Sequence, residues 1–132
     1  MRLSDAIMMG RVYIEKPNVT DYCGCAIGMG LASLIGEQLQ TNSYDALNRA
    51  YKAWPFLGDE INPPHEFLKQ SRKSVEGIIS MWFCFVQSQS QEVPEQYRSL
   101  ESLCDWVRSI ESAEDDIVII ESTEEVEYAS VT

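Results

Sequence analysis

The chain has 132 residues, of which 45% are hydrophobic and 23% charged, and 21 acidic against 10 basic side chains give a net charge of −11. This length and apolar content fit one domain with a core of its own, which excludes wholesale disorder, collagen-like repetition and a disulfide-stapled miniprotein. A pI near 4.4 argues against nucleic acid and anionic membrane surfaces as direct ligands, because both are bound through Lys and Arg.

The acidic excess is concentrated near the C-terminus. All ten Lys and Arg residues lie at or before Arg108, and the eight acids that follow have no base among them: Glu111, Glu114, Asp115, Asp116, Glu121, Glu124, Glu125 and Glu127. Residues 1–108 therefore keep 13 acids and 10 bases, a net charge of −3. We expect a nearly balanced body followed by an acidic tail.

The cellular compartment is predicted from features near the start and middle of the chain. Asp5 stands where a signal peptide would begin its apolar run. The longest apolar stretch, Gly77 to Val86, is too short to cross a bilayer. A content of four cysteines is ordinary for a cytosolic protein, whose thiols are kept reduced. These observations predict a cytoplasmic protein without membrane contact.

The first half of the chain predicts three helices. Residues 3–9 form the first, with Ser4 as its N-cap and Gly10 as its end, and residues 11–17 follow as a loop. Residues 21–36 form the second, nearly all buried, with Gly36 at its C-terminal end. Its interior glycines indicate close approach of a neighbouring helix. Apolar residues line one side of this second helix: Ile27, Leu31, Leu34 and Ile35.

A third helix, capped by Asn42 or Ser43, runs to about Ala53 and is broken at Trp54-Pro55. The fourth helical region covers residues 65–89, with a break near 71–74, and contains the strongest helical periodicity in the chain. We predict that it is the central helix. Its periodic apolar residues are Val75, Ile78, Ile79, Trp82, Phe85 and Val86.

Ser99 caps a last helix that runs to about residue 111. Beyond it, Ile117, Val118, Ile119 and Ile120 form a run of β-branched residues between acids, which predicts a strand, and residues 126–131 could add a second one. The predicted fold is mainly α, a small bundle of four or five helices with a short C-terminal β-strand or hairpin. Its division is a helical domain over residues 1–111 and an acidic C-terminal tail with a strand over residues 112–132.

Four segments, in this order, resemble a group of small, uncharacterised bacterial and phage proteins. The segments are Leu3-Ser4-x-Ala6-Ile7-x-x-Gly10, Cys25-Ala26-Ile27-Gly28-x-Gly30, Trp54-Pro55-Phe56-Leu57, and Cys104-Asp105-Trp106-Val107 with Ile110-Glu111. Members of that group have Leu-Ser-x-Ala-Ile, Cys-Ala-Leu-Gly-Ala, Trp-Pro-Trp-Leu and Asp-Trp-Val segments. The resemblance covers roughly residues 1–111 and implies helical architecture and bacterial or phage origin, with no known activity. Many members also carry a Cys-Pro-x-Cys pair where this chain has Asn62-Pro63-Pro64-His65, so no metal role carries over to that loop.

The residues that could carry chemistry are few. Four thiols are candidate zinc ligands: Cys23, Cys25, Cys84 and Cys104. The single histidine, His65, stands at a Pro-rich segment where a surface position is ordinary, and no nucleophile with a base, P-loop or dinucleotide fingerprint is present. The spacing of the cysteines favours small buried hydrophobes over a metal site. Large aromatic residues could line a ligand pocket but more often fill the core of a small helical domain: Trp54, Phe56, Phe67, Trp82 and Trp106.

These patterns predict a non-enzymatic accessory or protein-interaction protein of bacterial or phage origin, without a cofactor. The interaction residues are Ile117, Val118, Ile119 and Ile120, because an apolar strand must be covered by the body, by a second copy or by a partner's sheet edge. We therefore expect a protein partner or a homodimer through the C-terminal strand. Two alternatives stay open: an acidic DNA mimic that inhibits a nucleic-acid-binding protein, and a thiol-based metal-binding or redox protein using Cys23 and Cys25.

Overall fold

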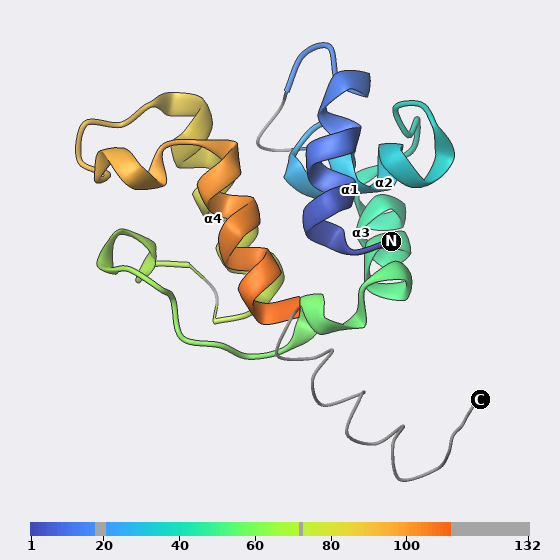
Figure 1. Ribbon diagram of the computed structural model, residues 1–132. Helices are drawn as coiled ribbons and strands as arrows, with labels where there is room; N and C mark the ends of the chain where they lie inside the picture. The colour runs from blue at the N-terminus through green and yellow to red at the C-terminus, as the bar shows by residue number, and fades with distance from the viewer. Residues whose placement is uncertain (18–20, 72, 112–132) are drawn as a thin grey trace, which may run out of the picture.

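A computed structural model describes residues 1–17, 21–71 and 73–111. This part of the chain is mainly helical (Figure 1), which confirms the predicted fold class in outline. The predicted C-terminal strand and hairpin lie outside the described residues. The α-helices are α1 Leu3–Gly10, α2 Ala26–Ile35, α3 Ser43–Ala53, α4 Val75–Ser88 and a final helix over residues 100–111. Single 3₁₀ turns occur at η1 Arg11–Tyr13, η2 Pro55–Gly58, η3 Glu66–Leu68 and η4 Glu95–Tyr97.

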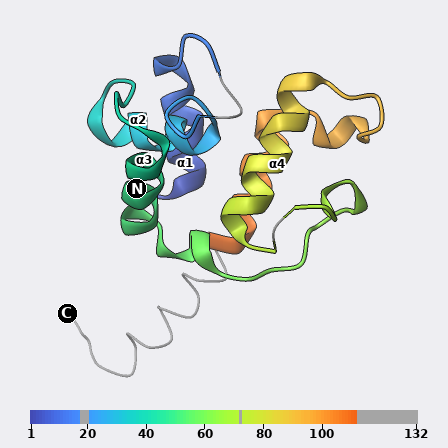
Figure 2. The ribbon, with the colours of Figure 1, turned by 180° about the vertical axis from the view of Figure 1, so that it is seen from behind.

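The helices form two groups, as seen from the front in Figure 1 and from behind in Figure 2. Helices α1, α2 and α3 make one group, while α4 and the final helix make the other, and η2 connects α3 to the second group. The two helices of the second group are in contact, since the rings of Trp82 and Trp106 lie 5.8 Å apart. Helix α4 also packs against α2, η2 and η3, so it takes the central position that its periodicity predicts.

Helices α1 and α2 approach each other backbone to backbone. A Cβ atom added at Gly10 would lie only 1.6 Å from the carbonyl oxygen of Met29. The hydroxyl of Ser33 donates a hydrogen bond to the carbonyl of Ala6 across the same contact. Gly28 is packed in a similar way against the backbone of Cys23, 2.4 Å from the position of its missing Cβ. Gly30 faces the Leu3 side chain of α1, as predicted, whereas Gly28 faces the turn before its own helix and the closest contact between the two helices involves Gly10.

Local capping chemistry explains several helix ends. The side chain of Asn42 accepts a hydrogen bond from the Asp45 amide at 2.8 Å, and Ser74 accepts from the Gly77 amide at 3.1 Å. Gly36 ends α2 with φ 79°, a left-handed conformation that glycine adopts without a Cβ clash. Ser99 accepts from the Ser102 amide at 3.1 Å. The predicted caps at Asn42, Gly36 and Ser99 are confirmed.

The predicted N-cap of α1 is wrong. The N-cap position belongs to Arg2, and Ser4 lies fully buried inside the first turn. The Ser4 hydroxyl bonds to Glu111, a residue 107 positions away, and is therefore not a local cap. Gly10 is the last residue of α1, as predicted, but its φ of −79° is right-handed and the chain continues directly into η1. Its role is the contact with α2.

Two predicted helix boundaries are also too early. Helix α2 starts at Ala26 and not near Asp21, because the Asp21 carboxylate accepts a hydrogen bond from the Cys23 amide at 2.9 Å and holds a turn there. The predicted helix from residue 65 is only the single turn η3, after which α4 begins at Val75. An isolated antiparallel bridge between Glu60 and Ser74 pairs the two segments that flank η3.

The core lies between the two groups of helices and is formed by the periodic residues of α4 and by α1 and α2. Trp82 is 1% exposed and its indole N–H donates to the Tyr97 carbonyl at 2.8 Å. Phe85 is half-buried, unlike the other members of the predicted apolar set. The buried residues of α4 are Val75, Glu76, Gly77, Ile78, Ile79, Trp82, Phe83 and Val86.

Candidate functional site

The four cysteines do not form a metal site within the described residues, where no group of three or more His, Cys, Asp or Glu side chains could hold an ion. Cys23, Cys25 and Cys104 are buried free thiols, and Cys84 is exposed. The thiol of Cys23 donates to the Thr41 carbonyl at 3.1 Å, and Cys25 occupies the N-cap position of α2. These positions favour packing roles for the buried thiols.

Burial also makes two of these thiols poor nucleophiles. It raises the pKa of Cys25 to about 11, more than the backbone amides of Gly28 and Ile27 lower it. Burial likewise raises the pKa of Cys104 to about 12. Because the thiolate is the reactive form, both residues are held as neutral thiols near pH 7.

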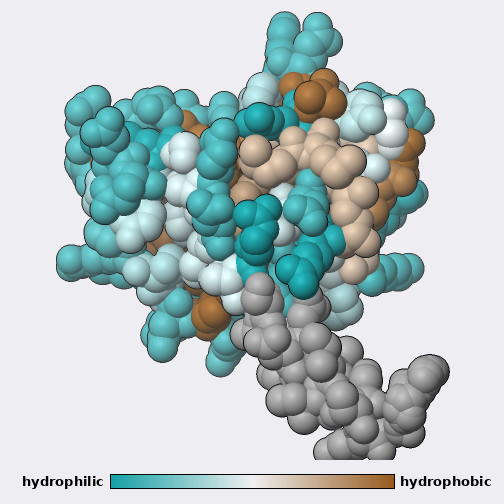
Figure 3. Space-filling view, viewed as in Figure 1, coloured by the Kyte–Doolittle hydropathy of each residue, from teal (hydrophilic) through white to brown (hydrophobic). Residues whose placement is uncertain are grey.

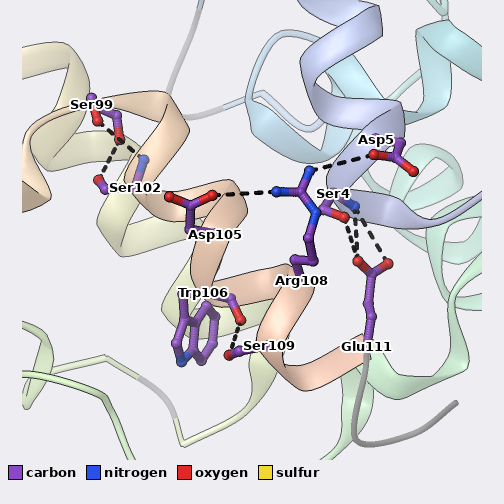
Figure 4. A network of polar contacts seen from close by, with 9 residues as sticks. All are labelled: Ser4, Asp5, Ser99, Ser102, Asp105, Trp106, Arg108, Ser109 and Glu111. Carbon is purple, nitrogen blue, oxygen red and sulfur yellow. Dashed lines mark hydrogen bonds and ion pairs between the residues drawn. The ribbon is translucent and has the colours of Figure 1, made fainter. Parts of the chain in front are cut away.

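A buried carboxylate at Glu111 joins the end of the final helix to the start of α1 (Figure 4). Glu111 is 5% exposed, and its oxygens accept hydrogen bonds from the Ser4 hydroxyl at 2.5 Å and from the Ser4 amide at 3.3 and 3.4 Å. Close by, the guanidinium of Arg108 pairs with Asp5 at 3.4 Å and with Asp105 at 3.3 Å. A carboxylate is favourable at the N-terminus of α1, where free backbone amides and the helix dipole attract negative charge.

A second buried carboxylate, Glu76, lies in the first turn of α4. It is 1% exposed and accepts hydrogen bonds from the hydroxyl of Tyr22 at 2.6 Å and from that of Ser80 at 2.9 Å. It therefore ties the turn before α2 to α4. Sequence reasoning overlooked both Glu76 and Glu111, since each acid is separated from its distant partner by more than fifty residues.

The segments that carry the sequence resemblance are in contact with one another. The missing Cβ of Gly30 would lie 3.0 Å from the Leu3 side chain and 3.2 Å from the Trp54 ring. The Trp54 indole N–H donates to the Met1 carbonyl at 3.0 Å, while Ser4 bonds to Glu111. Their shared role in the structure is to pack α1, α2, η2 and the final helix. A shallow cleft of about 430 Å³ opens beside this junction, lined by Met1, Arg2, Ala53, Trp54, Pro55, Phe56 and Glu111.

An apolar groove lies at the C-terminal end of α2. We define this α2 groove by its lining residues, Leu31, Leu34, Ile35, Leu39 and Arg49, which enclose about 120 Å³. Leu34 is 46% exposed and Ile35 is 48% exposed, so the prediction that this helix is nearly all buried fails at its last turn. Other large apolar side chains are also exposed around α1 and η1, including Met9 at 58% and Val12 at 77%. Figure 3 shows apolar side chains gathered over α1.

The aromatic residues divide between core and surface. Trp54 and Trp82 are buried, whereas Phe56, Phe67 and Trp106 are partly buried and pack on the core from outside. The four residues predicted to carry interaction, Ile117, Val118, Ile119 and Ile120, lie outside the described residues. No helix in the described ranges combines the length and the apolar character that crossing a membrane requires.

No known protein family, curated protein or solved structure matches this chain.

Proposed function

We propose that this protein acts by binding another chain without catalysis, and that its partner is a second copy of itself. In this proposal, Ile117 to Ile120 of one copy, called the 117–120 segment, occupies the α2 groove of the other. The exposed α2 groove is the observation that carries the proposal, because aliphatic side chains at the end of an otherwise buried helix gain stability when they are covered.

The 117–120 segment has the chemistry that this groove requires. Its four β-branched residues suit an apolar surface, and the acids on both sides, Asp116 and Glu121, suit the Arg49 side chain at the groove. Arg49 donates from Nε to Asp45 at 2.9 Å. No described residue accepts a hydrogen bond from its two terminal nitrogens, so they remain available for a second carboxylate.

The reach of the chain favours a second copy over the same copy. Five residues, 112–116, separate Glu111 from the segment, and the six Cα–Cα steps from Glu111 to Ile117 span at most about 22 Å when fully extended. A domain of this size is roughly 34 Å across. The final helix ends at the lower side of Figure 1, whereas the loop that follows α2 lies at the upper right.

The predicted strand also lacks a sheet to join. Across residues 1–17, 21–71 and 73–111, β pairing is limited to the bridge between Glu60 and Ser74. A strand needs an exposed sheet edge for backbone pairing. Side-chain docking in a groove between helices is therefore the mode of covering that the described part of the chain offers.

Light scattering after size exclusion tests the proposal with full-length variants. We expect wild type to have twice the chain mass of 15.0 kDa. Leu34→Ser and Ile119→Asp should each shift the protein toward the monomer, because each removes apolar burial worth about 1 kcal/mol or more, which raises the dimer dissociation constant about fivefold or more. Val12→Ser, at an exposed apolar residue outside the groove, and Val131→Asp, in the same tail, are matched controls and should remain dimeric.

A monomeric wild type at every concentration would refute the second-copy proposal. So would a dimer that survives both Leu34→Ser and Ile119→Asp. Circular dichroism of each variant checks that helix content is retained, so that a lower mass reports lost association.

A further inference from the structure

A second cleft lies at the end of the molecule opposite α3, between η3, α4 and the loop before η4. It encloses about 250 Å³ and is lined by His65, Glu66, Phe67, Phe85, Glu92 and Val93. We call it the aromatic cleft. It is smaller than the ~300–1,000 Å³ pockets that take drug-sized ligands, so it admits a compact headgroup. It is separate from the α2 groove and plays no part in the proposed dimer.

Three aromatic rings line this cleft, and two more hold them in place. Phe67 lies at the centre, with ring centroids 5.2 Å from His65 and 5.5 Å from Phe85. Tyr97 and Trp82 support it from behind at 5.4 and 5.8 Å. Because η3, α4 and η4 each contribute rings to this contact network, the cleft is preformed.

The charge of the aromatic cleft is negative. Glu66 and Glu92 are its charged lining residues within the described part of the chain. Glu66 makes an ion pair with Lys69 at 3.5 Å, but its side chain is 80% exposed, so the pair is weak and can be exchanged. The Nδ1 atom of His65 accepts a hydrogen bond from the Phe67 amide at 3.2 Å, an arrangement that requires Nδ1 to carry no proton.

The guanidinium of Arg98 is bonded to the backbone of the loop that lines the cleft. Arg98 donates from Nε to the Val93 carbonyl at 2.8 Å and from Nη2 to the Gln91 carbonyl at 3.4 Å. These bonds fix the loop that carries Glu92. The Arg98 guanidinium therefore bonds to loop carbonyls. Among the described contacts it pairs with neither Glu66 nor Glu92.

We propose that the aromatic cleft binds a methylated ammonium group. Aromatic faces attract cations through their quadrupole, most effectively when the cation has a weakly hydrated surface. Methyl groups supply apolar contact with Phe67 and Phe85, while the two glutamates supply opposite charge at the rim. The source of the group is either a free molecule such as choline or a trimethylated lysine of a peptide, and the same chemistry recognises both.

Titration of the full-length protein followed by amide NMR tests this proposal at constant ionic strength. The probes are choline, tetramethylammonium, a short peptide with one trimethyl-lysine, and 3,3-dimethyl-1-butanol, the neutral isostere of choline. We expect saturable shifts at the amides of Phe67, Phe85 and Val93 with a cationic probe. The neutral isostere should bind at least about tenfold more weakly than choline, because it has the shape of choline without its charge. Tighter binding of choline assigns a free ligand, and tighter binding of the peptide assigns a methylated chain.

Two substitutions localise the effect. Phe85→Leu keeps apolar bulk but removes a ring, and should weaken binding of the cationic probes between about 2-fold and 30-fold. Glu92→Gln changes an exposed side chain without risk to folding and should also weaken it. Glu95→Gln, an exposed acid of η4 outside the cleft, is the matched control and should leave binding unchanged. The proposal is overturned if no probe gives saturable shifts, if the neutral isostere binds as well as choline, or if Glu92→Gln has no more effect than Glu95→Gln.

Discussion

The contact between α1 and α2 predicts a graded response to alanine at three glycines. At Gly10 the added Cβ would lie 1.6 Å from the Met29 carbonyl oxygen and 2.7 Å from the Ser33 hydroxyl oxygen. Real Cβ contacts essentially never fall below 3.0 Å, so the two helices must separate by about 1.4 Å. At Gly30 the neighbours are side chains at 3.0 Å or more, and at Gly36 there is no atom within 4 Å.

The magnitudes follow from these distances. Overpacking against backbone costs about 3 kcal/mol or more, and separating the helices also removes the hydrogen bond from Ser33 to Ala6, worth about 1 kcal/mol. The higher helix propensity of alanine returns about 1 kcal/mol. We therefore expect Gly10→Ala to lower the free energy of unfolding by about 3 kcal/mol. Gly36→Ala should lose about 1 kcal/mol because φ is 79°, and Gly30→Ala should change it by less than about 1 kcal/mol.

Urea unfolding followed by far-ultraviolet circular dichroism measures all three variants. Gly10→Ala should also lower the Tm by roughly 10 °C. If its free energy of unfolding stays within about 1 kcal/mol of wild type, with helicity unchanged, then α1 and α2 are not in backbone contact. A larger loss of stability at Gly36 than at Gly10 would also contradict the reasoning, since a Cβ at Gly36 meets no atom whereas a Cβ at Gly10 meets the Met29 backbone.

Two further predictions concern the buried acid and the thiols. Glu111→Gln should lower the free energy of unfolding by about 1–2 kcal/mol, because it removes the negative charge from the hydrogen bonds with Ser4. Glu101→Gln, at an exposed acid of the same helix, is the control and should lose less than about 1 kcal/mol in the same urea assay. Equal losses in the two variants would contradict the inference. Native protein treated with a thiol reagent near pH 8 should be labelled at the exposed Cys84 but not at Cys25. Burial raises the pKa of Cys25 to about 11, so its thiol stays protonated at pH 8. Mass spectrometry of peptides checks this, and labelling of Cys25 at the rate of Cys84 would show that Cys25 is accessible.

The parts of the fold that sequence reasoning anticipated rest on local chemistry. Asn42 and Gly36 act within one turn of the residues they cap, so their roles can be read from neighbours in the sequence. The periodicity of α4 records which side of one helix faces the core, and Trp82 lies on that side. Each of these signals lies within a single helix or its ends.

The features that it missed depend on distant partners. Ser4 has the composition of an N-cap, but its hydroxyl is used by Glu111, which no local pattern indicates. Gly10 ends α1 as its composition indicates, but its close contact with Met29 depends on the distant helix α2. In the α2 groove, the sequence shows that Leu34 is apolar, whereas its exposure depends on how far α3 covers α2. Phe67 likewise became part of a cleft only because η3, α4 and η4 meet there.

The bond between Ser4 and Glu111 has a consequence for synthesis of the chain. A ribosome releases residues in order, so α1 emerges first, while the carboxylate that satisfies its opening turn is made more than a hundred residues later. Until then the amide and hydroxyl of Ser4 lack their native acceptor. The bonds between Ser4 and Glu111 can therefore form only after the last turn of the final helix has been synthesised. A nascent chain that stops just before Glu111 would lack the carboxylate that bonds to the first turn of α1.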